Sequence, residues 1–248
     1  MPFAPPNVLA FAASDPTGGA GVQADILTLA SLGCHPLTVL TALTVQDTRG
    51  VQRVQAVDAN RVAEQGRCLL AELPVAAFKL GVLGSAANAA VVAAVLAAHR
   101  RIPVVLDPVL ASGRGDALAD DALREALLRQ LVPLATLVTP NSVEARALGG
   151  VEALIALGCR YVLVTGTHAH TREVVNTLHD AGGVVREDRW PRLPASYHGS
   201  GCTLASALAA RLALGDAAPE AARAAQDYTW HALERGFRPG SGQYLPRR

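Results

Sequence analysis

Lysine is almost absent from the sequence. Lys79 is the single lysine, between Phe78 and Leu80, and the other cationic side chains apart from histidine are arginines. A Walker-type phosphate loop needs a lysine directly before serine or threonine, so the sequence excludes that class of nucleotide site. A Schiff-base lysine would have to be Lys79, which is a poor candidate because it stands inside an apolar run of strand type.

Aromatic residues and an excess of charge of one sign are also lacking. Phenylalanine, tryptophan and tyrosine make up 4% of the chain, and the formal net charge is +1. A base-stacking surface needs aromatic side chains, and binding to a phosphate backbone needs clustered basic residues. The sequence therefore predicts that no nucleic acid is a partner of this protein.

The cysteines and the apolar runs exclude further classes of protein. The four cysteines are widely spaced and form no CxxC pair, which argues against a disulfide framework and against a zinc site. The sequence has no apolar run of about 18 residues and no basic region followed by an apolar one near its start. We therefore expect a cytoplasmic protein with no membrane as a partner.

Apolar runs of strand length alternate with helical patterns along all 248 residues. The expected strands are 8–13, 37–45, 51–57, 76–83, 103–108, 134–140 and 161–166, with a hairpin at 173–178 and 183–190. The expected helices are 22–32, 61–73, 86–101, 116–132, 200–214 and 217–237, and another begins near Asn141. Because no linker or repeat interrupts the alternation, we predict one three-layer α/β domain, residues 1–248, with a mostly parallel sheet. The strict alternation of 51–57 predicts an edge or lid strand with one solvent-exposed face.

The sequence His198-Gly-Ser-Gly-Cys-Thr203 stands directly before an Ala- and Leu-rich helix. Gly199 and Gly201 allow a tight turn and a close approach to a ligand. The free N–H groups of a helix start attract an anion, so the pattern indicates a phosphate site. In this field we expect the pKa of the Cys202 thiol to fall and a thiolate to form. The alternative is a capped loop beside a small buried cysteine.

Acidic and amide residues follow two of the expected strands. Asp107 comes at the carboxyl end of strand 103–108, the edge where parallel sheets bind ligands, which makes it a candidate site residue. Asn141 and Glu144 have the spacing of a capping box, which is a structural arrangement. The same spacing places both on one helix face, where they could reach a magnesium–phosphate group, so both interpretations stay open.

The first glycine-rich turn allows a different function. Gly19-x-Gly21-x-x-Ala24 fits the fingerprint of a NAD-binding Rossmann oxidoreductase. The match is weak, because polar residues 14–17 lengthen the turn and no acidic strand end follows at the expected distance. Asp25, one turn into the next helix, is either a solvated charge or points over the turn into a pocket. His168 and His170 are interpreted as loop residues, since no third metal ligand is near.

Six motifs occur in order along the chain. They are Ser14-Asp-Pro-Thr-Gly-Gly-Ala-Gly-Val-Gln-Ala-Asp25, Thr41-Ala-Leu-Thr-Val-Gln46-Asp-Thr48, Lys79-Leu-Gly-Val-Leu-Gly84, Leu106-Asp-Pro-Val109, Val138-Thr-Pro-Asn-Ser-Val-Glu144 and His198-Gly-Ser-Gly-Cys-Thr203. In these motifs the chain resembles the hydroxymethylpyrimidine/phosphomethylpyrimidine kinases of thiamine biosynthesis, in the ribokinase-like superfamily. The resemblance runs from about residue 8 to residue 214.

The resemblance implies a ribokinase-like fold and a bifunctional kinase that uses ATP and Mg²⁺. The enzyme would phosphorylate the hydroxymethyl group of 4-amino-5-hydroxymethyl-2-methylpyrimidine and then convert the monophosphate to the diphosphate. Its partners would be these small molecules. Apolar residues in the segment 37–57 would suit the contact of a homodimer.

The resemblance also implies roles for residues at matching positions. Gln46 would hydrogen-bond the aminopyrimidine, a task that suits an amide with a donor and an acceptor. The rest of the substrate pocket would be lined by Ala13, Ala20, Asp25, Val82 and Val109. Magnesium would be held by Asp107 and Glu144, and ATP would meet Asn141, Thr165 and Gly166.

Cys202 stands where sugar kinases and pyridoxal kinases of the superfamily carry an aspartate base. The resemblance therefore implies that a Cys202 thiolate accepts the proton of the substrate. The amides from Gly199 to Cys202, with Gly201 between them, would stabilise the phosphoryl group in transfer.

The sequence departs from the family pattern in three ways. Ala13 stands where glycine is more frequent and Val82 where methionine is common, so the pocket should pack differently. Because Lys79 is the single lysine, Arg114 is the candidate for a phosphate contact that lysine makes in relatives.

Two other functions stay open beside the oxidoreductase. A pyridoxal or pyridoxamine kinase would share the fold, although Gln46 and Cys202 argue against it. A thiol hydrolase could use Cys202 with His198, but the glycine turn between them makes a fixed hydrogen bond between the two side chains difficult.

Overall fold

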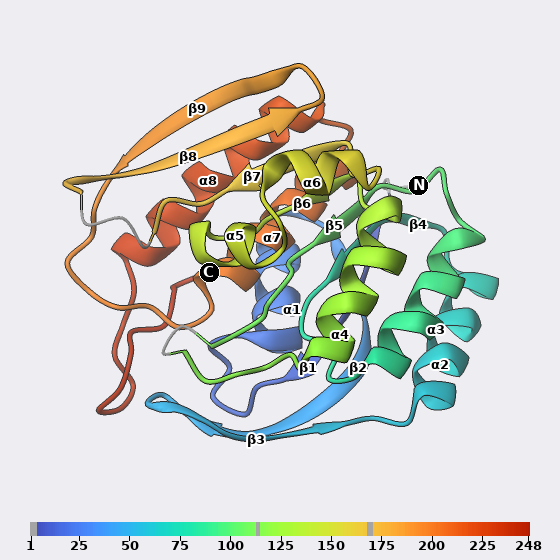
Figure 1. Cartoon of the computed structure of the whole chain (residues 1–248). Helices are drawn as coiled ribbons and strands as arrows, with labels where there is room; N and C mark the ends of the chain where they lie inside the picture. The colour runs from blue at the N-terminus through green and yellow to red at the C-terminus, as the bar shows by residue number, and fades with distance from the viewer. Residues whose placement is uncertain (1–3, 113–114, 168–170) are drawn as a thin grey trace.

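The structure, a computed structural model, describes residues 4–112, 115–167 and 171–248. Within them, nine strands form one sheet in the order β3-β2-β1-β4-β5-β6-β7-β8-β9 (Figure 1). The strands are β1 (Asn7–Ser14), β2 (His35–Asp47), β3 (Gly50–Ala56), β4 (Val75–Leu80), β5 (Val104–Leu106), β6 (Leu137–Val138), β7 (Tyr161–Val164), β8 (Glu173–Asp180) and β9 (Gly183–Pro191).

The middle of the sheet is parallel. β1 pairs in parallel with β2 and β4, and the parallel pairing continues through β5 and β6 to β7. β3 is antiparallel to β2 at one edge, and the β8–β9 hairpin extends the other edge. The predicted mostly parallel sheet, the edge strand and the hairpin are therefore confirmed.

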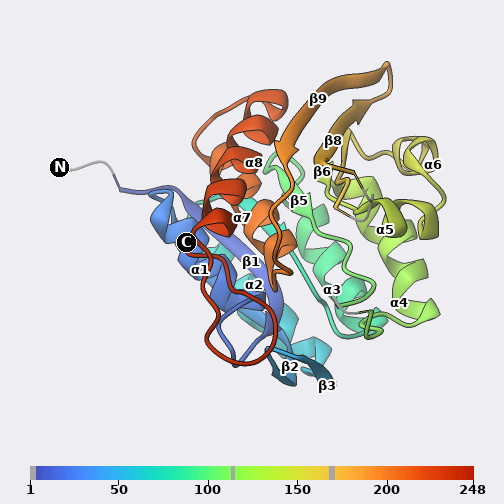
Figure 2. The same ribbon diagram turned by 90° about the vertical axis from the view of Figure 1, so that its left-hand side faces the viewer.

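Helices cover both faces of the sheet. They are α1 (Gly21–Ser31), α2 (Ala59–Glu72), α3 (Ala86–Ala97), α4 (Asp121–Ala126), α5 (Ser142–Ala147), α6 (Val151–Ala156), α7 (Ser200–Ala213) and α8 (Ala218–Glu234). Alternate residues of β1 divide between two cores: Leu9 and Phe11 pack with α2, α3 and α4, whereas Val8 packs with α1, α7 and α8. Figure 2 shows α1, α7 and α8 on one side and α3 to α6 on the other. The predicted three layers are confirmed.

α7 is enclosed by other elements along most of its length. Every residue from Thr203 to Ala210 is buried, and the helix contacts α1, α8, β4 and β5. Small side chains allow this close approach, because alanine adds little bulk and loses little entropy in a helix. The packing places the N-terminus of α7 at the edge where the parallel strands end.

Most predicted elements differ from the observed ones by a few residues at their ends, and one helix and two strands differ more clearly. The helix expected at 116–132 begins at Asp121, because the Asp120 side chain caps Leu123 N–H. Its α-helical part ends at Ala126 and continues as a π-helical segment, Leu127–Leu131, and a 3₁₀ turn, Val132–Leu134. β6 covers only Leu137–Val138, and β7 ends at Val164. In the described part of the chain, no helix is long and apolar enough to cross a membrane.

Candidate functional site

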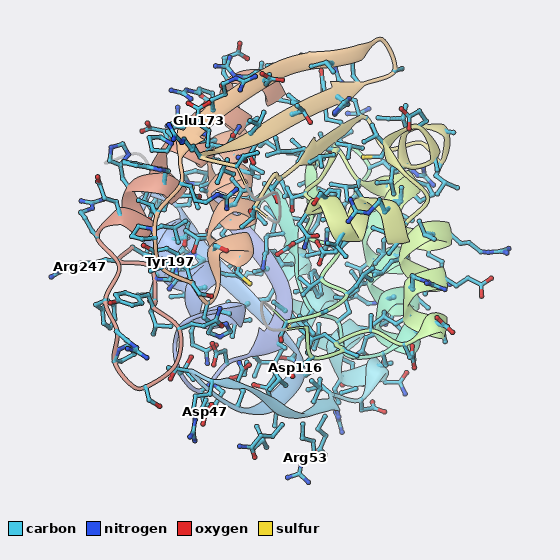
Figure 3. The ribbon with its side chains drawn as sticks, turned by 60° about the vertical axis from the view of Figure 1, so that its left-hand side comes forward. Asp47, Arg53, Asp116, Glu173, Tyr197 and Arg247 are labelled. Carbon is cyan, nitrogen blue, oxygen red and sulfur yellow. The ribbon has the colours of Figure 1, made fainter. Side chains whose placement is uncertain are left out.

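A cavity of about 530 Å³ opens at the carboxyl edge of the parallel strands. The chain segments that follow β1, β2, β4, β5, β6 and β7 contribute to its wall, together with the first turn of α7. Twelve of the predicted site residues line it: Ala13, Ala20, Gln46, Val82, Asp107, Val109, Asn141, Glu144, Thr165, Gly199, Gly201 and Cys202. Tyr197, labelled in Figure 3, lies on the same wall. Arg114, His168 and His170 lie outside the described residues.

The N-terminus of α7 has the geometry of an anion site. Gly199 precedes the helix with φ +81°, and a Cβ there would stand 1.8 Å from the carbonyl oxygen of Gly19. Only glycine fits this left-handed and crowded position. The first intrahelical bond joins Thr203 N–H to Gly199 O at 3.0 Å. The N–H groups of Ser200, Gly201 and Cys202 precede that bond and are available to a ligand in the cavity.

The predicted thiolate at Cys202 is wrong for the protein without ligands. Burial raises the pKa of the Cys202 thiol to about 11, the Lys79 ammonium opposes this rise, and the charges of Asp107 and Asp25 add to it. The N–H of Gly21 also favours the thiolate through a hydrogen bond to the sulfur. The prediction counted the field of the helix start but not the loss of water and the two carboxylates around the thiol.

Asp25 does not line the cavity, so its expected place in the substrate pocket is wrong. It is fully buried and pairs with Lys79 Nζ at 2.8 Å. The hydroxyl of Ser206 in α7 donates to the same carboxylate at 2.7 Å. Burial opposes the charge on Lys79, but the neighbouring Asp25, Cys202 and Asp107 raise its pKa overall. The single lysine therefore forms a buried ion pair near the cavity.

Asp107 and Glu144 form a pair of interacting acidic groups. Burial raises the pKa of Asp107 to about 6, which Lys79 opposes and Asp25 reinforces. Burial, with the charge of Asp107, raises the pKa of Glu144 to about 7. Among the described residues, Asp107 Oδ2 is buried with no hydrogen-bond partner. Two carboxylates that are costly to ionise, one with an unpartnered oxygen, favour a bound cation.

Asn141 and Glu144 form the predicted capping box, and both also line the cavity. Asn141 Oδ1 accepts the N–H of Glu144 at 2.9 Å, and Glu144 Oε2 accepts the N–H of Asn141 at 2.9 Å, which is a complete capping box. Glu144 Oε1 also accepts the N–H of Leu110 at 3.3 Å. These bonds fix the carboxylate in place while both residues line the cavity. No group of three or more acidic, histidine or cysteine side chains suited to a metal occurs among the described residues.

The first glycine-rich turn is filled by its own aspartate. Asp15 is 1% exposed and accepts the N–H groups of Thr17 at 2.8 Å and Ala20 at 2.7 Å. His198 Nε2 lies 2.8 Å from Asp15 Oδ2. Burial opposes the ionisation of Asp15, but the bonds from His198 and Thr17 lower its pKa to about 2.

Two alternative functions lose their basis at this turn. The Asp15 carboxylate fills the turn and accepts the N–H of Ala20, between the two glycines of the fingerprint, so an anionic group already stands where a pyrophosphate would bind; this argues against the oxidoreductase. His198 is engaged with Asp15 rather than with Cys202, which argues against the thiol hydrolase.

The part of the cavity formed by β8, β9 and α8 contains residues that the sequence analysis did not identify. Both tryptophans of the chain, Trp190 and Trp230, line it with their rings stacked at 6.3 Å, and Gln226 receives the indole N–H of Trp190 at 3.0 Å. Asn176 donates to Gln226 at 2.9 Å and accepts the N–H of Gly166 at 3.0 Å. Gly166 thus lies behind Thr165 and outside the lining residues. The sequence carried no signal for this end beyond the rarity of tryptophan, which by itself does not locate a site.

A family model described as phosphomethylpyrimidine kinase matches residues 15–247 of this chain. A curated relative from Streptomyces coelicolor, named hydroxymethylpyrimidine/phosphomethylpyrimidine kinase, is 40% identical over 97% of this chain and 93% of its own length.

Solved structures show the same fold. The pyridoxal kinase of Bacillus subtilis in complex with ADP has a TM-score of 0.89 at 28% identity, covering 98% of this chain and 97% of the other. The phosphomethylpyrimidine kinase of Clostridium difficile has a TM-score of 0.80 at 30% identity, covering 92% of this chain and 99% of the other. The predicted ribokinase-like architecture is confirmed by these structures.

Proposed function

The chain belongs to the phosphomethylpyrimidine kinase family, and from this premise we propose that it transfers phosphoryl groups from ATP to a pyrimidine alcohol. The substrate is 4-amino-5-hydroxymethyl-2-methylpyrimidine, whose hydroxymethyl group is phosphorylated first, followed by the monophosphate. The observation that carries the proposal is a single cavity in which the N-terminus of α7 faces the buried carboxylate of Asp107. A Cβ on Gly201 would lie 3.5 Å from Asp107 Oδ2.

The pyrimidine binds at the end of the cavity formed by β1 and β2. Gln46 lines this end and offers both a donor and an acceptor to an aminopyrimidine edge. Ala13, Ala20, Val82 and Val109 provide apolar wall around it. A largely apolar wall with a few polar groups orients a flat heterocycle so that its hydroxymethyl group points toward Cys202.

The phosphoryl group is held by the backbone at the start of α7. The N–H groups of Ser200, Gly201 and Cys202 stabilise the charge that spreads over its oxygens during transfer. Asp107 and Glu144 fit Mg²⁺, because Asp107 Oδ2 is unpartnered among the described residues and because carboxylate oxygen is the donor that this ion prefers. When bound, the ion neutralises phosphate charge.

Cys202 is the catalytic residue next to the reacting hydroxyl. Burial raises the pKa of its thiol to about 11, so the thiol is protonated at neutral pH; it gives this proton to solvent water, and the thiolate then accepts the proton of the hydroxymethyl group. The Lys79 charge and the Gly21 N–H both favour the thiolate. Phosphoryl transfer needs little help from a strong base, because the transition state is loose and the alcohol loses its proton late.

The nucleotide extends toward the β7 end of the cavity. Asn141 and Thr165 line this part, and Gly166 supports it from behind through its bond to Asn176. We also propose a cytoplasmic location, which suits the use of ATP and the free thiol of Cys202. The other partner is a second copy of the chain, because Leu43 and Val45 in β2 are 51% and 44% exposed. A monomeric mass in light scattering would contradict the dimer.

A coupled assay of ADP release tests the function. The reaction contains ATP, Mg²⁺ and the hydroxymethylpyrimidine, with pyridoxal in a parallel reaction and Cys202→Ala beside the wild type. We expect two ADP for each pyrimidine and a strongly impaired variant. The solved pyridoxal kinases make pyridoxal the second candidate. Turnover of pyridoxal alone would keep the fold and the phosphoryl site and would overturn the pyrimidine assignment.

A further inference from the structure

The side chain of Arg248 lies between the two glycine turns of the site. Its Nε donates to Thr203 Oγ1 at 3.0 Å. Its terminal amino groups donate to three carbonyl oxygens, those of Gly18, Gly19 and Gly199. One guanidinium therefore contacts the turn before α1 and both the cap and the first turn of α7. Figure 2 shows the C-terminus beside α1 and α7.

The segment that carries Arg248 is fixed along the rim of the cavity. Tyr244 N–H donates to Ser196 O, and His198 N–H donates to Tyr244 O, each at 2.9 Å. Gln243 N–H donates to Thr48 O at 2.8 Å. These backbone bonds hold the segment that leads to Arg248 against the residues on either side of it.

The guanidinium of Arg248 reduces the repulsion between backbone carbonyl groups at the two turns. The carbonyl oxygen of Gly19 approaches Gly199 so closely that a Cβ would stand 1.8 Å from it. The carbonyl oxygens of Gly19 and Gly199 both bind the guanidinium, so a cation lies between two dipoles whose negative ends converge. Arginine suits this task because it is always charged and presents several donors in a rigid plane.

The charge of Arg248 also reaches the anion site. In the described part of the chain, no carboxylate forms an ion pair with its guanidinium within 4.0 Å. All of its hydrogen bonds go to carbonyl and hydroxyl oxygens, so its positive charge lies behind the start of α7 without a directly bonded carboxylate. Burial lowers the pKa of Arg248, and the charges of Cys202, Asp25 and Asp15 oppose this, which places the guanidinium within electrostatic reach of the thiol.

We propose that Arg248 is a positioning residue for phosphoryl transfer. It holds the two glycine turns together and places a permanent positive charge behind the N–H groups that bind the phosphoryl group. This inference rests on the proposed kinase function. Because charge builds up on the phosphoryl oxygens in the transition state, the loss of Arg248 should lower kcat more than it raises the KM of the pyrimidine.

The experiment compares three variants with the wild type. Arg248→Gln removes the charge, Arg248→Lys keeps the charge without the planar fork, and Arg247→Gln is the matched control. Arg247 is exposed and points away from the protein body (Figure 3). For each we measure kcat, the KM of the pyrimidine and the thermal unfolding temperature. The unfolding temperature is measured in inorganic phosphate and in chloride of equal ionic strength.

We expect Arg248→Gln to lower kcat by about tenfold or more, since a preorganised charge acts directly on the transition state. The KM of the pyrimidine should change by less than about threefold, because that ligand binds elsewhere in the cavity. Arg248→Lys should recover part of kcat, and Arg247→Gln should match the wild type. Phosphate should raise the unfolding temperature of the wild type and of Arg247→Gln but not of Arg248→Gln.

Several results would overturn the proposal. One is a wild-type kcat in folded Arg248→Gln. Another is an Arg248→Gln protein whose activity falls only in proportion to its folded fraction and whose unfolding temperature is still raised by phosphate. If Arg248→Gln does not fold, the kcat of Arg248→Lys is the test, and a wild-type value would overturn the proposal. If neither variant folds, Arg248 is a purely structural residue and the proposal is also overturned. The phosphate measurement needs no pyrimidine, so it separates failure of this proposal from failure of the proposed function.

Discussion

Asp107→Asn should make the ligand-free protein more stable at alkaline pH while it removes phosphoryl transfer. Asp107 is 5% exposed, and its Oδ2 has no hydrogen-bond partner among the described residues. Burial raises the pKa of this carboxyl from 3.8 to about 6. The folded protein therefore binds the Asp107 proton more tightly than the unfolded chain does, and the ionised form costs stability.

The size of this cost follows from the shift in pKa. A shift of about 2 units, at 1.36 kcal/mol each, corresponds to about 3 kcal/mol. The cost is absent below the unfolded pKa of 3.8, grows as the pH rises, and is complete above the folded pKa of about 6. The amide that replaces the carboxyl group also needs hydrogen-bond partners, and this need reduces the gain in stability by about 1 kcal/mol. The net gain of about 2 kcal/mol should raise the unfolding temperature by about 4–8 °C for a chain of this length.

Thermal unfolding followed by circular dichroism measures this gain near pH 8 and near pH 5, on either side of the Asp107 transition. Asp121→Asn is the matched control, because that side chain is 93% exposed and its replacement should change stability by less than about 0.5 kcal/mol. Mg²⁺ should stabilise the wild type but not Asp107→Asn, because the variant lacks one of the two proposed ligands. ADP release by the variant should be lost.

Three results would contradict this reasoning about Asp107. The first is a variant that is less stable than the wild type near pH 8. The second is an equal gain at both pH values, since a gain from removing charge must shrink when the carboxyl is protonated. The third is equal stabilisation of both proteins by Mg²⁺, which would move the cation away from Asp107.

Three further predictions concern other parts of the site. Gly199→Ala should give little folded or active protein, because its φ is +81° and the new Cβ would stand 1.8 Å from Gly19 O; normal activity in a soluble Gly199→Ala protein would contradict this. Gln226→Leu should lower stability by about 2–4 kcal/mol, because the buried N–H donors of Asn176 and Trp190 lose their acceptor. It should also raise the KM of ATP more than that of the pyrimidine; chemical denaturation and steady-state kinetics check both. Alkylation of Cys202 by iodoacetamide should be slow at neutral pH, and its rate should rise about tenfold per pH unit until the pH nears the pKa of about 11. Exposed Cys68 is the internal control and should react faster. Fast alkylation of Cys202 at neutral pH, followed by peptide mass spectrometry, would contradict the raised pKa.

The order of the elements was predictable because local signals agree with the final fold. The apolar run before Asp107 is buried on both faces in β5, and the polar residue after it lies at the carboxyl edge, as the sequence indicated. The capping box of Asn141 and Glu144 is also local, so its spacing predicted both the start of α5 and the position of the carboxylate. Gly199 was predictable as a turn because few other residues adopt its conformation.

The errors concern groups whose partners are distant in the sequence. Asp25 pairs with Lys79, which lies 54 positions later in the sequence. The sequence around Asp25 does not reveal whether its side chain faces the cavity or pairs with Lys79. The pKa of the Cys202 thiol is raised, whereas the sequence predicted that it is lowered. The field of a helix start is a local property, but the desolvation of the thiol depends on every residue packed around it.

Sequence alone determined the fold class, the family and the position of the glycine turn before α7, since each follows from short motifs and from the alternation of apolar runs. Only the tertiary structure decided which charges face one another. It placed the Asp107 and Glu144 carboxylates together, buried Lys79 against Asp25, and brought Arg248 to turns that lie more than 200 positions earlier and about 50 positions earlier in the chain. The physical reason is that burial and Coulomb interactions depend on distance in space, which the sequence does not specify one pair at a time.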